Sequence, residues 1–218
     1  KQINQNNYSP IEELAKDLCQ DQWYPLRCSG ACVCCRLYKC FPEKFPKEVN
    51  QEIISLASDP IIMVRCSLAK NVPVLIKAGA TQLASTILTT LSKDESAAVA
   101  IEIPVSLSLI APTDYDLALK ASETIYKTDI WQAKSVLISY IDQIFKEKPP
   151  KDFLKQIIST AQVDQENVIR ASIARQIPFI YQSGCLPFDK FQQFVMSLIS
   201  DSESCIRIAV AEALGRTP

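Results

Sequence analysis

The residues with the most obvious capacity for chemistry are five cysteines within the 13-residue stretch CSGACVCCRLYKC, namely Cys28, Cys32, Cys34, Cys35 and Cys40. Thiolates bind zinc and undergo redox reactions, so a metal site and a redox sensor are two interpretations. The spacing C-x3-C-x-C-C-x4-C lacks the paired C-x-x-C of zinc knuckles, and the sequence has no His. Cysteine also packs as a small hydrophobe, and Cys28, Cys32 and Cys35 would share one helix face. Structural packing is the favoured interpretation.

Other catalytic chemistry finds little support in the composition. Without His the commonest general base is missing, and the 4 glycines do not form a phosphate-binding motif. A net charge of -1 argues against nucleic acid as a partner, and no apolar run is long enough for a membrane helix. Nine irregularly spaced cysteines without a signal peptide favour reduced thiols in the cytoplasm or nucleus. We therefore expect a non-enzymatic protein with no cofactor.

The elements that position these residues repeat along the chain. Six segments share an apolar helical run, a polar turn that carries Asp, and usually an Arg shortly afterwards. The turn aspartates lie 35 to 38 residues apart, at Asp21, Asp59, Asp94, Asp129, Asp164 and Asp201. A regular period of this length is typical of stacked helical repeats. It predicts an all-α solenoid in one domain over 1–218, with units at about 10–44, 45–79, 80–111, 112–148, 149–184 and 185–218, the last one truncated.

Each unit is predicted to be a helix, a turn and a second helix. In the second unit Pro60 should occupy the first turn of the second helix, and Gly79 should end that helix. Pro73 and Pro178 lie eight residues after an Arg in their units, deep in the second helix. They should bend it.

The stretches LCQDQWYPLRCSGACVCC and LASDPIIMVRCSLAKNVPVL resemble consecutive HEAT repeats of the scaffolding A subunit of type 2A protein serine/threonine phosphatase. The resemblance covers about 10–216 and is weaker in units three and four, where Ala100 and Lys134 depart from the Arg pattern. It leaves open a diverged paralogue. It implies a protein that holds the regulatory subunit on this portion, with the catalytic subunit on repeats beyond residue 218, so that the chain would be part of a longer array. The alternative is another HEAT adaptor, such as a transport receptor with cargo on the concave face.

By the same resemblance, partners should contact the turns within the repeats. These residues are Trp23, Tyr24, Pro25, Ile61, Ile62, Met63, Glu95, Ser96, Ile130, Trp131, Gln165, Glu166, Asn167, Ser202 and Glu203. Aromatic residues and Met are common interface anchors, although either tryptophan ring could instead fold back onto the next repeat. A structural role is expected for the pairs Asp21/Arg27, Asp59/Arg65, Asp164/Arg170 and Asp201/Arg207, as a ladder of ion pairs between successive turns. The Asp could also cap the following helix.

Overall fold

The computed structural model describes residues 9–40 and 47–216, and every regular element in these ranges is helical. The predicted all-α class is confirmed. The first helices of successive pairs are, in chain order, α1 (Ser9–Gln20), α3 (Lys47–Ser55) with the short 3-10 turn η1 (Leu56–Ser58), α5 (Thr81–Leu91), α8 (Tyr115–Lys127), α11 (Lys151–Ala161) and α14 (Phe188–Ile199). The second helices are, in the same order, α2 (Tyr24–Cys40), α4 (Ile62–Lys77), the divided helix α6 (Ala97–Ala100) and α7 (Ile103–Ile110), the divided helix α9 (Trp131–Ser139) and α10 (Ile141–Ile144), the divided helix α12 (Asn167–Arg175) and α13 (Ile177–Ser183), and α15 (Ser204–Leu214).

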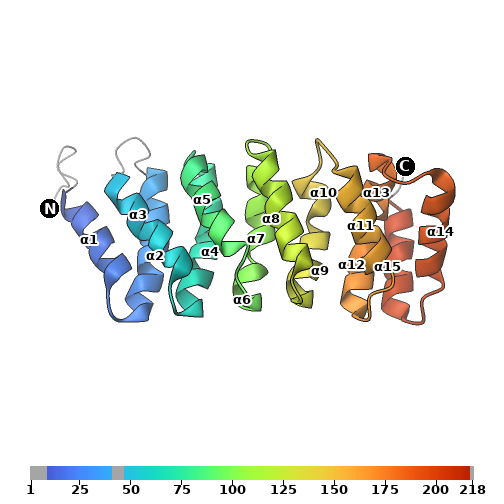
Figure 1. Ribbon diagram of the computed structural model, residues 1–218, viewed down its shortest axis with the longest axis horizontal. Helices are drawn as coiled ribbons and strands as arrows, with labels where there is room; N and C mark the ends of the chain where they lie inside the picture. Colours follow the sequence, from blue (N-terminus) through green and yellow to red (C-terminus); the bar gives the residue numbers. More distant parts are fainter. Residues whose placement is uncertain (1–8, 41–46, 217–218) are drawn as a thin grey trace.

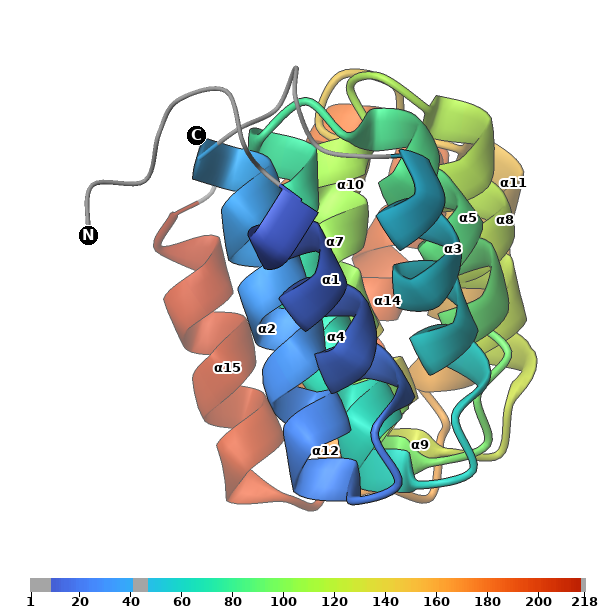
Figure 2. The same cartoon turned by 90° about the vertical axis from the view of Figure 1, so that its left-hand side faces the viewer.

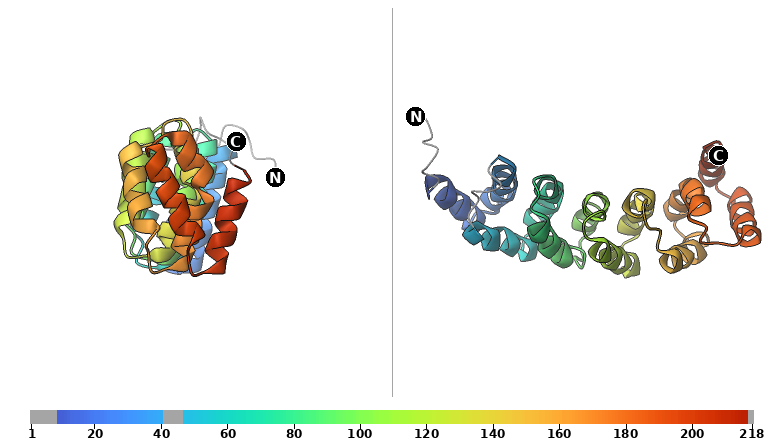
Figure 3. Two further views of the ribbon diagram at one scale, coloured as in Figure 1. Left: turned by 90° about the vertical axis from the view of Figure 1, so that its right-hand side faces the viewer. Right: turned by 90° about the horizontal axis from the view of Figure 1, so that it is seen from above.

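The helix pairs stand side by side in an elongated row (Figure 1). The turns within the pairs lie along the lower edge in that view, and the connections between pairs in the range 47–216 lie along the upper edge. The second helices form one layer, in which α2 packs on α4, α4 on α7, α9 on α12, and α12 on α15. The view along the row in Figure 2 separates this layer from the layer of α3, α5, α8 and α11. Figure 3 shows that the row is gently curved, with the second helices on its concave side.

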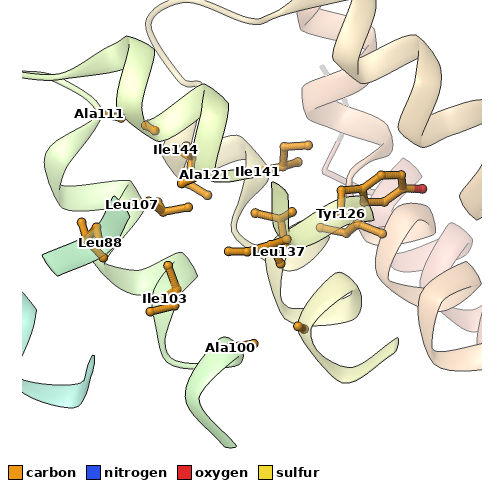
Figure 4. Packing of buried hydrophobic residues seen from close by; sticks show 14 of the residues in the cluster. Leu88, Ala100, Ile103, Leu107, Ala111, Ala121, Tyr126, Leu137, Ile141 and Ile144 are labelled. Carbon is orange, nitrogen blue, oxygen red and sulfur yellow. The ribbon is translucent and has the colours of Figure 1, made fainter. Parts of the chain in front are cut away.

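A continuous apolar core runs between the two layers. In α11, for example, Phe153, Leu154, Ile157, Ile158 and Ala161 are buried, which is the spacing of one helix face. In the middle of the row several helices contribute to the core (Figure 4), with Leu88 of α5, Ala100 of α6, Ile103 and Leu107 of α7, Ala121 and Tyr126 of α8, Leu137 of α9, and Ile141 and Ile144 of α10. One pair alone could not bury these faces, so each pair depends on its neighbours.

The glycine and proline predictions have mixed outcomes. Gly79 and Gly184 follow second helices with positive φ, 83° and 56°, as a helix-ending glycine should. The prediction for Pro60 is wrong, because α4 begins at Ile62. Pro73 lies inside the continuous helix α4. Pro178 lies in the first turn of α13, after a break at Gln176 that divides the second helix in two.

Candidate interaction surface on the turns

Five of the six turns within the helix pairs share one hydrogen-bonded geometry, which their aspartates fix. In the second pair, Asp59 Oδ1 accepts the backbone N–H of Ile61 at 2.8 Å, and α4 starts at the next residue. The Asp therefore forms the turn that precedes the helix and is not its N-cap, which explains why Pro60 lies outside the helix. The same bond to the second residue after the Asp recurs, at 2.7 to 2.9 Å, for Asp21, Asp94, Asp164 and Asp201.

Arginines join three of these turns to the next. Arg65 donates from Nη1 to the carbonyl oxygen of Asp59 at 2.7 Å, and from Nε and Nη2 to the carboxylate of Asp94 in the following turn at 2.6 and 3.2 Å. A planar guanidinium with five donors suits this bridging position. Equivalent ion pairs join Arg27 to Asp59 and Arg170 to Asp201. Arg207 makes the bond to the carbonyl oxygen of its own turn, at Asp201.

The ion pairs shift the ionisation of two turn aspartates. Hydrogen bonds from Arg170 lower the pKa of Asp201 below its ordinary value, against the opposing effect of burial. For Asp59, burial is the largest single influence and raises the pKa, but the hydrogen bonds from Arg27 and the N–H of Ile61, together with the charges of Arg27 and Arg65, lower the net pKa. Both carboxylates therefore act as structural anions at neutral pH.

This ladder is interrupted in the middle of the row. Ala100 stands where units one, two, five and six have Arg, so no guanidinium extends from α6 towards Asp129. In the next unit Lys134 has its Nζ over the ring of Tyr126, 5.8 Å from the centroid. The turn beside Trp131 is thus held differently from those in the first two pairs.

Large apolar side chains are exposed on the first two turns. Trp23 is 64% exposed and Met63 is 58% exposed, and Tyr24, Ile61 and Ile62 are also exposed. We call these five residues the apolar ridge patch. The bond from Arg27 to Asp59 fixes the two turns relative to each other, so the patch spans two neighbouring helix pairs on a defined backbone. Trp23 does not fold back into the core.

The remaining turn residues are also accessible. Trp131 is exposed to a smaller extent, 38%, while Pro25, Ser96 and Ile130 are partly exposed. The polar residues at the other turns are exposed, namely Glu95, Gln165, Glu166, Asn167, Ser202 and Glu203. The sequence interpretation missed Val163 and Val168, two exposed apolar residues that flank the fifth turn. A valine directly before a turn Asp, outside the apolar face of α11, is the signal that could have identified the first of them.

The burial of the cysteines differs from the prediction that Cys28, Cys32 and Cys35 share one packed helix face. Within the cluster Cys34 and Cys35 are buried, Cys28 and Cys32 are only partly buried, and Cys40 is exposed. Burial raises the pKa of Cys35 to about 12, as expected for an inert packed thiol. In the described part of the chain, no group of three or more Cys, Asp or Glu side chains is arranged to hold a metal ion.

No family model matches the chain, and no curated protein matches it. Among the described residues, no helix has both the length and the apolar character needed to cross a membrane.

Proposed function

We propose that this chain is a HEAT-type α-solenoid that acts as a non-enzymatic scaffold, and that it belongs to the scaffolding A subunit of a type 2A serine/threonine phosphatase or to a close paralogue. The sequence resemblance of units one, two, five and six supports this. The row of helix pairs in two curved layers is compatible with it (Figure 3). The ion pairs between successive turns are also compatible, because they keep one edge of the row in register.

The observation that carries the scaffold proposal is the apolar ridge patch. Exposed clusters of Trp, Tyr, Met and Ile are unusual on a surface that stays in water and are common at the centre of protein interfaces. The hydrogen bonds of the turns fix the backbone that carries these side chains before a partner arrives. Binding then requires little additional ordering of the scaffold.

In this proposal the regulatory subunit contacts the turns described above, and the catalytic subunit binds repeats beyond residue 218. The scaffold promotes catalysis by raising the effective concentration of one subunit near the other. Such a protein needs no cofactor and works in the cytoplasm or nucleus.

The test is binding of a purified regulatory subunit of type 2A phosphatase to the chain, measured by calorimetry. The test variant is Trp23→Ala with Met63→Ala. The chain offers a matched control in Phe188→Ala with Met196→Ala, because Phe188 is 66% exposed and Met196 58%, but both belong to α14 and lie outside the apolar ridge patch. Loss of two interface anchors should weaken binding about 30-fold or more.

The control variant should bind like the unchanged chain, and both variants should keep their helicity by circular dichroism. Equal binding by all three proteins would reject the patch as the contact surface and favour an adaptor that holds its cargo on the concave face. No binding by the unchanged chain would reject the phosphatase assignment for this portion.

A further inference from the structure

Two buried cysteines from different helices face each other at the first pair. Cys19, in the last turn of α1, has its Sγ 3.6 Å from Sγ of Cys34 in α2. The Sγ of Cys34 also lies 3.8 Å from the carbonyl oxygen of Ala15. Cys19 lies outside the five-cysteine cluster, so only the packing of the two helices makes a pair of thiols at this position.

Gly30 explains why the helices come so close. A Cβ atom at Gly30 would lie 3.0 Å from the backbone nitrogen of Cys19 and 3.1 Å from its Sγ. With a glycine here the backbones of α1 and α2 can approach, one helical turn before Cys34. At the other end of the contact, the bonds of Asp21 to Trp23 and of Arg27 to Asp21 fix the connecting turn. The two sulfur atoms are therefore held near each other by the fold itself.

The two thiols are chemically unequal. The hydrogen bond with Cys34 lowers the pKa of Cys19, although burial and the charge of Glu52 oppose this. The same bond raises the pKa of Cys34, and burial adds to the effect. The thiolate is the reactive form of cysteine. Cys19 is also the member of the pair nearer to solvent, 3% exposed against 0% for Cys34, so we assign the first reaction to Cys19 and the second to Cys34.

We propose that Cys19 and Cys34 are a redox modification site that forms a disulfide on reaction with a hydroperoxide. The thiolate of Cys19 attacks one peroxide oxygen, the O–O bond breaks, and a sulfenic acid forms at Cys19. With hydrogen peroxide, the hydroxide that leaves takes up the proton that Cys19 lost and becomes water. The sulfur of Cys34 then attacks the sulfur of Cys19, and the Cys34 proton leaves with the hydroxyl group as a second water. Two thiols are oxidised and one peroxide is reduced.

The bond requires a modest movement and has a defined structural effect. A disulfide needs a sulfur–sulfur distance of about 2.0 Å, so the two atoms must approach by about 1.6 Å, which side-chain rotation and a small shift of α1 can supply. The loop that the disulfide would close, residues 19–34, contains the first turn with Trp23 and Tyr24. The disulfide would tie α1 to α2 and restrict the unfolded chain. This inference does not depend on the phosphatase assignment.

The experiment uses the purified chain with Cys40→Ser and Cys205→Ser, which removes the two exposed thiols. The protein is treated with hydrogen peroxide, unfolded, alkylated and digested with trypsin. We expect a loss of two free thiols, reversed by dithiothreitol, and a disulfide between the peptides 17–27 and 28–36 that fragmentation assigns to Cys34. The oxidised protein should also melt at a higher temperature than the reduced one.

Cys19→Ser should abolish both the cross-link and the shift in melting temperature. Cys185→Ser is the matched control, because Cys185 and Cys19 are each 3% exposed, and it should leave both unchanged. If Cys19→Ser does not fold, Cys34→Ala is the second variant. The absence of the cross-link in the folded parent protein, or its assignment to Cys28, Cys32 or Cys35, would overturn the proposal.

Discussion

Arg65→Met tests whether the ion pairs between turns hold the row of helices together. Arg65 makes two bonds to the carboxylate of Asp94 and one to the carbonyl oxygen of Asp59, and the side chains of Arg65 and Asp94 are only 18% and 6% exposed. Removing one partner of a fully buried pair costs about 3–5 kcal/mol. Because some water reaches this pair, and Asp94 keeps its bond from the N–H of Ser96, we expect a cost of about 2–3 kcal/mol.

The same helix contains a matched control. Lys70 of α4 also forms an ion pair with the next helix pair, at 3.7 Å to Glu102, but its side chain is 57% exposed. Lys70→Met makes the same change of charge and residue type and should cost less than about 1 kcal/mol. Thermal unfolding followed by circular dichroism should show a drop of about 5–10 °C for Arg65→Met, and little change for Lys70→Met.

A double-mutant cycle separates the ion pair from the other roles of Arg65. Asp94→Asn in the Arg65→Met background should cost less than Asp94→Asn alone, because the carboxylate has already lost its partner. Equal costs for Arg65→Met and Lys70→Met, or additive costs in the cycle, would refute the view that the ladder stabilises the row.

Three further outcomes follow from the turns and helix contacts. The pKa of Asp201 is lowered in the folded chain. Its contribution to stability is therefore present above the unfolded pKa of about 4 and is lost as the pH falls through the folded pKa. Asp201→Asn should flatten the fall of melting temperature below about pH 4. Gly30→Ala should destabilise the chain by about 1–3 kcal/mol in urea unfolding, because the new Cβ meets the backbone of Cys19. Gly184→Ala should cost about 1 kcal/mol in the same assay, from backbone strain alone, since nothing lies within 4 Å of its Cβ position.

The repeat period could be recognised in the sequence because every unit has a turn Asp and four of the six have an Arg at a fixed distance after it. Arg65 bonds to its own turn at Asp59 and to the next turn at Asp94, and Arg27 and Arg170 make the equivalent ion pairs. A physical constraint that recurs in several units produces a periodic pattern in the sequence. The exposure of Trp23 and Met63 was foreseeable for the same reason, since neighbouring units cover the turns least.

Features that occur at only one place, through contacts between helices, produced no repeating pattern in the sequence. Fifteen residues separate Cys19 from Cys34, and only the close approach at Gly30 brings their sulfur atoms together. The break between α9 and α10 at Tyr140 has no proline to mark it, unlike the break before Pro178. The aspartate turn before α4 was mistaken for the start of the helix because Pro60 is equally compatible with both.

The middle of the row shows what replaces the ladder where its arginines are missing. The rings of Tyr126 and Phe145 each meet Phe153 of α11 edge-on, with centroids 5.9 and 6.2 Å apart. Between the fourth and fifth pairs, the hydroxyls of Ser135 and Ser172 lie 3.1 Å apart in the core. Aromatic contacts and hydrogen bonds between neutral hydroxyls are less sensitive to salt than ion pairs. High salt should therefore weaken the outer pairs relative to the central ones, and hydrogen exchange resolved by helix pair would detect the difference. Uniform weakening along the row would show that the ladder adds nothing specific to the pairs that possess it.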